Sequence, residues 1–124
     1  MTTETIEPTV RPISAQSDAA EALVALISMF GHLPGGYIKI FQQFTSLPVD
    51  LGLQLDSPRD FEQWRAVLGI TPSDVELCHD GVSGWLRAEG VFRGVGVKIT
   101  GHGVVLPAKQ NEQQAADEIA EVSA

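Results

Sequence analysis

The chain contains a single cysteine among its 124 residues, so no disulfide can form within it. Nothing therefore indicates an oxidising compartment, and we expect the protein to be cytoplasmic. No stretch approaches the roughly 18 apolar residues of a membrane-spanning helix, and the N-terminal sequence lacks the basic start and apolar run of a signal peptide. We expect neither export nor contact with the membrane.

Basic residues are also scarce: eight Lys and Arg stand against sixteen Asp and Glu, which gives a formal net charge of −8. A protein that binds the phosphate backbone needs Lys and Arg along one face, so no direct nucleic-acid binding is expected. The excess of acidic residues is compatible with another class of protein, an inhibitor that imitates nucleic acid. Such an inhibitor requires carboxylates aligned on one surface, for which the candidates are Glu62, Asp74, Glu76 and Asp80.

Familiar catalytic motifs are absent. There is no Gly-x-Ser-x-Gly turn, no helical His-Glu-x-x-His and no calcium loop. The stretches "GHLPGG" and "GHGVVLP" lack the Lys and the Ser or Thr of a phosphate-binding loop, and they are expected to be turns. These absences favour a protein without catalytic activity but leave the question open.

Three segments are expected along the chain. Residues 1 to 16 are rich in Thr, Glu and Pro and predict a disordered leader, and residues 17 to 106 predict one α+β domain. The acidic residues 107 to 124 predict a flexible or marginally helical tail. We therefore expect a single folded unit with flexible termini.

The first helix is predicted to start at Ser17 as N-cap and to end near Gly31. Its apolar positions between Leu23 and Phe30 cover more than half of the circumference, which is wider than an ordinary amphipathic stripe. The helix is thus expected to be either well buried or paired with another chain, and a homodimer is one possibility.

Two period-two stretches, "YIKIFQQF" and "VDLGLQLDS", follow the first helix and predict an antiparallel strand pair. A second helix is predicted from the cap Ser57 to Gly69, with Phe61 and Trp64 packed onto the sheet. Further strands begin at "VELCH". The fold class is therefore α+β, with an antiparallel sheet of two hairpin-like groups packed against two helices in the order α-β-β-α-β-β-β.

The stretch "GWLRAEGVFRGVGVKITGH" predicts a hairpin with a two-residue turn at Arg93 and Gly94. This register pairs Phe92 with Val95 and Ala88 with Ile99 on the face toward the helices. On the other face Glu89 lies opposite Lys98, as an ion pair, and Trp85 lies opposite His102.

That second face is the candidate binding surface. We expect Trp85, Arg87, Lys98 and His102 to contact a partner protein there, because Trp and Arg are frequent binding hot spots. The alternative is that Trp85 only covers the sheet or packs under the tail.

The sequence "ELCHDG" places Cys78 beside His79 and Asp80. Neighbouring side chains of a strand point to opposite faces, so Cys78 and His79 are expected to point apart, and Asp80 with Gly81 predicts a turn. The three histidines, His32, His79 and His102, match no metal-binding spacing. We therefore predict no catalytic residue, no metal ligand and no cofactor.

Together, "LGLQLDSPRDFEQWRAVLGI" and "GVFRGVGVKITGHGVVL" resemble small uncharacterised proteins of actinomycete genomes and their mobile elements or phages. The resemblance covers roughly residues 34 to 106. It implies an accessory role in a bacterial or phage setting and assigns no role to any residue.

The leading hypothesis is a non-enzymatic protein-interaction module, accessory or regulatory, that binds through an exposed sheet face or through the first helix. The first alternative is a small-molecule binder or small enzyme with a pocket between the first helix and the sheet, where Tyr37, Cys78 or a histidine supplies polar contacts. The second is the acidic inhibitor that imitates nucleic acid.

Overall fold

The computed structural model describes residues 12 to 42 and 47 to 106. The elements are η2 (Ile13–Gln16), α1 (Ser17–Met29), β1 (Tyr37–Phe41), β2 (Asp50–Leu55), α2 (Pro58–Val67), η3 (Pro72–Asp74), β3 (Glu76–His79), β4 (Gly84–Phe92) and β5 (Val95–Val104). The α+β class is confirmed. The order differs in detail from the expected one, because two short 3-10 helices precede α1 and β3.

The start of α1 differs from the prediction by one residue. Gln16 occupies the N-cap position, and Ser17 is already helical. The hydroxyl of Ser17 donates instead to the carbonyl of Ser14, at 2.7 Å, and so joins α1 to η2. The 3-10 helix η2 covers the last four residues of the predicted leader, whereas residues 1 to 11 and the predicted tail lie outside the described residues.

The five strands form one sheet in the order β1-β2-β5-β4-β3. Its β1–β2 pair is antiparallel, as are β3–β4 and β4–β5, but β2 and β5 are parallel neighbours. The prediction of an antiparallel sheet was wrong, and the sheet is mixed. Parallel neighbours need a long crossover connection, which the segment from α2 through β4 provides, so pairing only strands adjacent in sequence missed this contact.

The predicted hairpin register is confirmed. Phe92 pairs with Val95, Ala88 with Ile99 and Trp85 with His102. At the turn, Arg93 has φ 54° and Gly94 has φ 80°. Two successive residues with positive φ are typical of the type I′ turn, whose twist matches that of the flanking strands.

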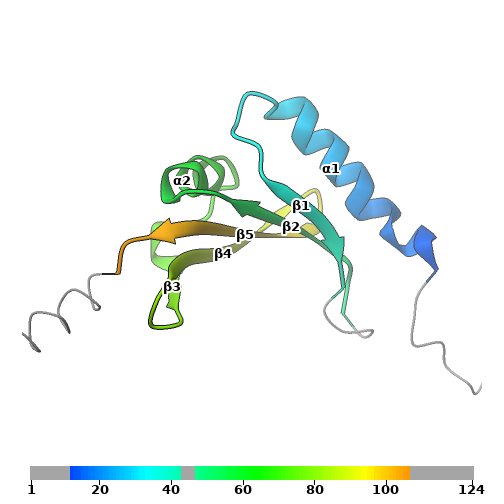
Figure 1. The fold of residues 1–124 in the computed structure, drawn as a ribbon. Helices are drawn as coiled ribbons and strands as arrows, with labels where there is room; N and C mark the ends of the chain where they lie inside the picture. The colour runs from blue at the N-terminus through cyan, green and yellow to red at the C-terminus, as the bar shows by residue number, and fades with distance from the viewer. Residues whose placement is uncertain (1–11, 43–46, 107–124) are drawn as a thin grey trace, which may run out of the picture.

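Both helices lie on one side of the sheet (Figure 1), and the core fills the space between them and the strands. From α2, the side chains of Phe61 and Trp64 are buried, as predicted. The hydroxyl of Ser57 accepts the N–H of Asp60 at 3.1 Å and caps this helix, also as predicted. The indole N–H of Trp64 donates to the carbonyl of Pro34 at 2.8 Å, which holds the segment after α1 against α2.

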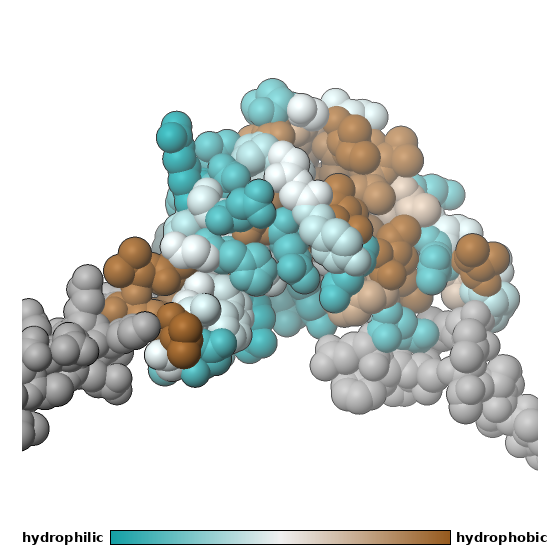
Figure 2. Space-filling model, viewed as in Figure 1, coloured by the Kyte–Doolittle hydropathy of each residue, from teal (hydrophilic) through white to brown (hydrophobic). Residues whose placement is uncertain are grey.

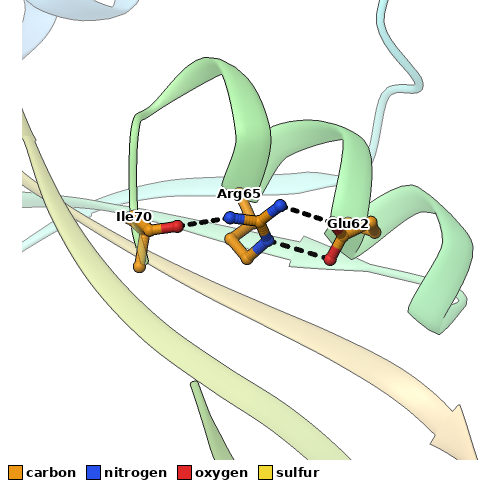
Figure 3. Close-up of polar contacts among 3 residues, drawn as sticks. All are labelled: Glu62, Arg65 and Ile70. Carbon is orange, nitrogen blue, oxygen red and sulfur yellow. Dashed lines mark hydrogen bonds and ion pairs between the residues drawn. The ribbon is translucent and has the colours of Figure 1, made fainter. Parts of the chain in front are cut away.

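The C-terminal end of α2 is held by Arg65. Its guanidinium group donates to the carboxylate of Glu62 and to the carbonyl of Ile70 (Figure 3). Ile70 is 5% exposed and belongs to the core cluster. The arginine therefore ties the chain beyond the helix back to the helix, next to a core side chain.

Helix α1 is buried along one side only. Ala19, Ala22 and Leu26 face the core, but Val24 and Ile27 are 64% and 56% exposed. The expectation that its wide apolar surface is well buried was wrong, since the sheet and α2 cover a narrower stripe than the sequence offers. Pairing of this surface with another chain stays a prediction.

The close contact between β5 and α2 can be tested at Gly101. A Cβ atom on this glycine would lie 2.5 Å from the Cβ of Phe61, and neither backbone can yield without moving the other. We expect Gly101→Ala to lower the free energy of unfolding by about 1–3 kcal/mol, as measured by urea denaturation. The matched control is Gly35→Ala, because a Cβ there meets nothing within 4 Å. Equal denaturation midpoints for the two variants would contradict the packing.

Candidate functional site

The side of the sheet away from the helices is covered by no described helix (Figure 1). Because side chains alternate along a strand, the register fixes which residues point there. We call this surface the open face, and it consists of Tyr37, Lys39, Phe41, Asp50, Gly52, Gln54, Glu76, Cys78, Trp85, Arg87, Glu89, Val91, Gly96, Lys98, Thr100 and His102. It contains residues from all five strands.

All four residues predicted to bind a partner lie on the open face. Trp85 and His102 are directly opposite each other on β4 and β5, and Arg87 and Lys98 belong to the same two strands. The structure thus brings together Trp85, Arg87, Lys98 and His102 on one surface. That they contact a partner stays a prediction.

Arg87 is held toward the edge strand β3. Its Nη2 atom lies 2.5 Å from Oε1 of Glu76, and both side chains are more than half exposed. This hydrogen bond stabilises the charged guanidinium and raises the pKa of Arg87. The ion pair fixes where the guanidinium lies, although an exposed pair of this kind adds little to stability.

Lys98 contacts residues of β2 and β1, on the same open face. Its Nζ atom lies 3.8 Å from Oδ2 of Asp50 and 5.3 Å from the ring centroid of Phe41. The sequence had suggested an ion pair with Glu89, which does lie opposite in register. Lys98 also forms an ion pair with Asp50, because the parallel pairing places β2 beside β5.

The ring of Phe41 has a second ammonium group nearby, since Nζ of Lys39 lies 5.0 Å from its centroid. Attraction between a cation and the face of an aromatic ring favours this arrangement. Between β5 and β2, Nε2 of His102 lies 3.2 Å from Oε1 of Gln54. Side chains of β1, β2 and β5 thus contact one another at two places on the open face.

Sequence reasoning missed the contributions of β1, β2 and β3 to this surface. Tyr37, Phe41 and Gln54 reach it through the β2–β5 pairing, and Glu76 reaches it through β3. The alternation of Tyr37, Lys39 and Phe41 with Ile38 and Ile40 was a signal for a shared face. It could not show which strand lies beside β2.

Cys78 and His102 both lie on the open face, but on strands that are not neighbours. Cys78 on β3 lies opposite Trp85 on β4, which lies opposite His102 on β5. Strands β3 and β5 are therefore two strand spacings, or about 10 Å, apart. A nucleophile and its base need hydrogen-bonding distance. Over the described ranges, no group of three or more His, Cys, Asp and Glu side chains is placed to hold a metal ion.

The four carboxylates proposed for nucleic-acid imitation do not form one acidic row. Glu62 lies on α2 and pairs with Arg65, whereas Glu76 lies on the open face and pairs with Arg87. Asp80 is part of the turn after β3. Two of these carboxylates pair with arginine, and they lie on different sides of the sheet, so Glu62 and Glu76 do not belong to one aligned acidic surface.

A cavity of about 160 Å³ lies between α1 and the sheet, where the sequence had suggested a pocket. Its polar contacts were expected from Tyr37, Cys78 or a histidine, and this expectation was wrong. None of these side chains lines the cavity, because Tyr37 and Cys78 point to the open face. The lining consists of apolar side chains, proline and glycine.

Comparisons with protein-family models, with curated proteins and with solved structures found no match. Among the helices of the described ranges, none has the length and apolar character needed to cross a lipid bilayer. The described residues form an α+β domain whose mixed sheet has helices on one side.

The predicted turn at Asp80 and Gly81 is confirmed, and it has a pH dependence that can be measured. The carboxylate accepts the N–H groups of Ser83 and Val82 at 2.7 Å and 2.9 Å, which lowers the pKa of Asp80. A lowered pKa stabilises the fold above the unfolded value of about 3.9, and this contribution is lost as the pH falls through the folded pKa.

We therefore expect the wild-type protein to lose more stability than Asp80→Asn between about pH 6 and about pH 3, since the asparagine does not titrate. Urea denaturation at both pH values measures the difference. Parallel loss in the two proteins would show that the carboxylate has no special role in the turn.

Proposed function

We propose that the protein is a non-enzymatic interaction module that binds a partner protein through its open face. The observation that carries this proposal is that three aromatic side chains, Tyr37, Phe41 and Trp85, belong to the side of the sheet that no described helix covers. Aromatic residues and arginine are enriched in protein interfaces, and Trp, Tyr and Arg are enriched among binding hot spots.

Charge favours a protein as the occupant. The open face contains three basic residues, Lys39, Arg87 and Lys98, and three acidic residues, Asp50, Glu76 and Glu89, so it has no net charge. The whole chain has a formal charge of −8. A nucleic acid is repelled by the chain and gains no compensating basic surface, whereas a protein with an apolar contact centre and little net charge meets no such repulsion.

Pre-organisation also supports binding at this surface. Arg87 and Lys98 are held by ion pairs, and His102 lies at hydrogen-bonding distance from Gln54. Side chains that are already ordered lose less conformational entropy when a partner binds. The strands beneath them are fixed by the sheet, so the surface is presented as one unit.

The setting that fits this proposal is an accessory or regulatory role in a bacterial or phage cytoplasm. The single Cys78 is compatible with a reducing compartment, and the resemblance to proteins of actinomycete mobile elements supports the bacterial setting. No cofactor or metal is part of the proposal.

The proposal predicts that Trp85→Ala combined with Arg87→Ala weakens binding of the partner by roughly tenfold or more. The partner is first isolated from the native cytoplasm with a C-terminal tag and identified by mass spectrometry. Its affinity for the purified wild-type and variant proteins is then measured by calorimetry, and circular dichroism checks that the variant is folded.

The matched control is Arg59→Ala, which removes an exposed arginine from α2 on the other side of the sheet. It is expected to leave the affinity unchanged. If the wild-type protein and the variant with Trp85→Ala and Arg87→Ala bind the partner with equal affinity, binding through the open face is contradicted. A protein that is isolated with no stoichiometric partner would direct attention to the cavity instead.

A further inference from the structure

The cavity beneath α1 is built from five elements and the segment that follows α1. Its lining is formed by Leu23, Leu26, Ile27, Phe30, Gly31, Leu33, Pro34, Gly35, Ile38, Leu51, Gly52, Leu53, Trp64 and Val97. No ionisable side chain is among them. The one side-chain N–H in the lining, that of the Trp64 indole, already donates to the carbonyl of Pro34.

The packing of α1 explains where the cavity lies. At the N-terminal half of the helix, Ala19 and Ala22 are 1% and 2% exposed, and such small side chains allow close contact with the core. In the C-terminal half, the larger residues Leu23 and Ile27 line the cavity, as does the C-cap residue Phe30. The cavity is therefore part of the way this helix meets the sheet and α2.

The mouth of the cavity is apolar as well. Ile27 on α1 and Ile38 on β1 both line it, yet they are 56% and 37% exposed. Figure 2 shows hydrophobic residues gathered over the region of α1. An apolar molecule that enters here displaces water from the surface of these side chains, which is favourable.

We propose that this cavity binds a small uncharged apolar molecule, an aromatic ring or a short hydrocarbon chain. A dry apolar cavity of about 150 Å³ accommodates benzene in another protein, and the volume here is about 160 Å³. Water gains few hydrogen bonds in such surroundings, and a charged group finds no partner. The volume suits one ring and is too small for the row of anchors that an amphipathic helix inserts.

The site is independent of the proposed partner-binding function, because the cavity and the open face lie on opposite sides of the sheet. A molecule bound in the cavity does not block Trp85 or Arg87. The two proposals can therefore fail separately.

Benzene is the probe for the test, with benzoate as the charged counterpart. Because benzene is expected to bind only the folded protein, it should raise the melting temperature progressively as its concentration increases and shift the methyl NMR signals of Leu26, Leu53 and Val97. Benzoate is expected to do neither, since its carboxylate has no partner in the cavity.

The variant Ile27→Trp places a larger apolar side chain at the mouth, where the residue is half exposed and the fold can tolerate it. We expect it to weaken benzene binding by about tenfold or more. The matched control is Val24→Trp, about one helical turn earlier, which is 64% exposed and does not line the cavity. It is expected to bind benzene as the wild-type protein does.

Three results would overturn the proposal. The first is a folded wild-type protein with no methyl shifts and no rise in melting temperature up to the solubility limit of benzene. The second is an equal benzene response in Ile27→Trp and the wild-type protein. The third is a dimer in sedimentation experiments that Ile27→Trp dissociates and Val24→Trp leaves intact, which would assign the mouth to a second copy of the chain.

Discussion

The parallel pairing of β2 with β5 is the contact on which the rest of the structure depends. It joins the β1–β2 hairpin to the antiparallel group β3–β4–β5, and it is the only strand pair that links these two groups within the described sheet. On the helix side it places Leu51 beside Val97 and Leu53 beside Ile99, and all four are buried. Burial of this apolar area stabilises the link, because each such side chain contributes roughly 1.5–3 kcal/mol.

The same pairing creates two surfaces of opposite character. On the helix side, apolar side chains form the core and line the cavity beneath α1. On the other side, the pairing places Asp50 of β2 near Lys98 of β5 and Gln54 near His102, so the polar groups of separate strand groups become one layer. An open sheet without this contact would present two unrelated strips. The open face is continuous because the β2–β5 pairing, which also brings core side chains together, joins the two groups of strands.

Local features were predictable from the sequence, and the long-range contact was not. The cap at Ser57, the turn at Arg93 and Gly94, and the register that places Trp85 opposite His102 all depend on neighbouring residues or on a short hairpin. Alternation also placed Trp85, Arg87, Lys98 and His102 together on the face away from the helices, as the structure has them. The position of β2 depends on a crossover through α2, β3 and β4, and period-two alternation is the same for parallel and antiparallel neighbours. For that reason Tyr37 and Phe41 were missed at the candidate site.

The central claim is that this mixed sheet presents one continuous binding surface. Chemical-shift mapping of the protein on addition of its purified partner tests it most directly. The account predicts that the affected signals include Tyr37 and Phe41 of β1 together with Trp85 and Arg87 of β4, which share one sheet face only because β2 pairs with β5. Shifts confined to α1, the cavity mouth or α2, with the open face unchanged, would contradict it.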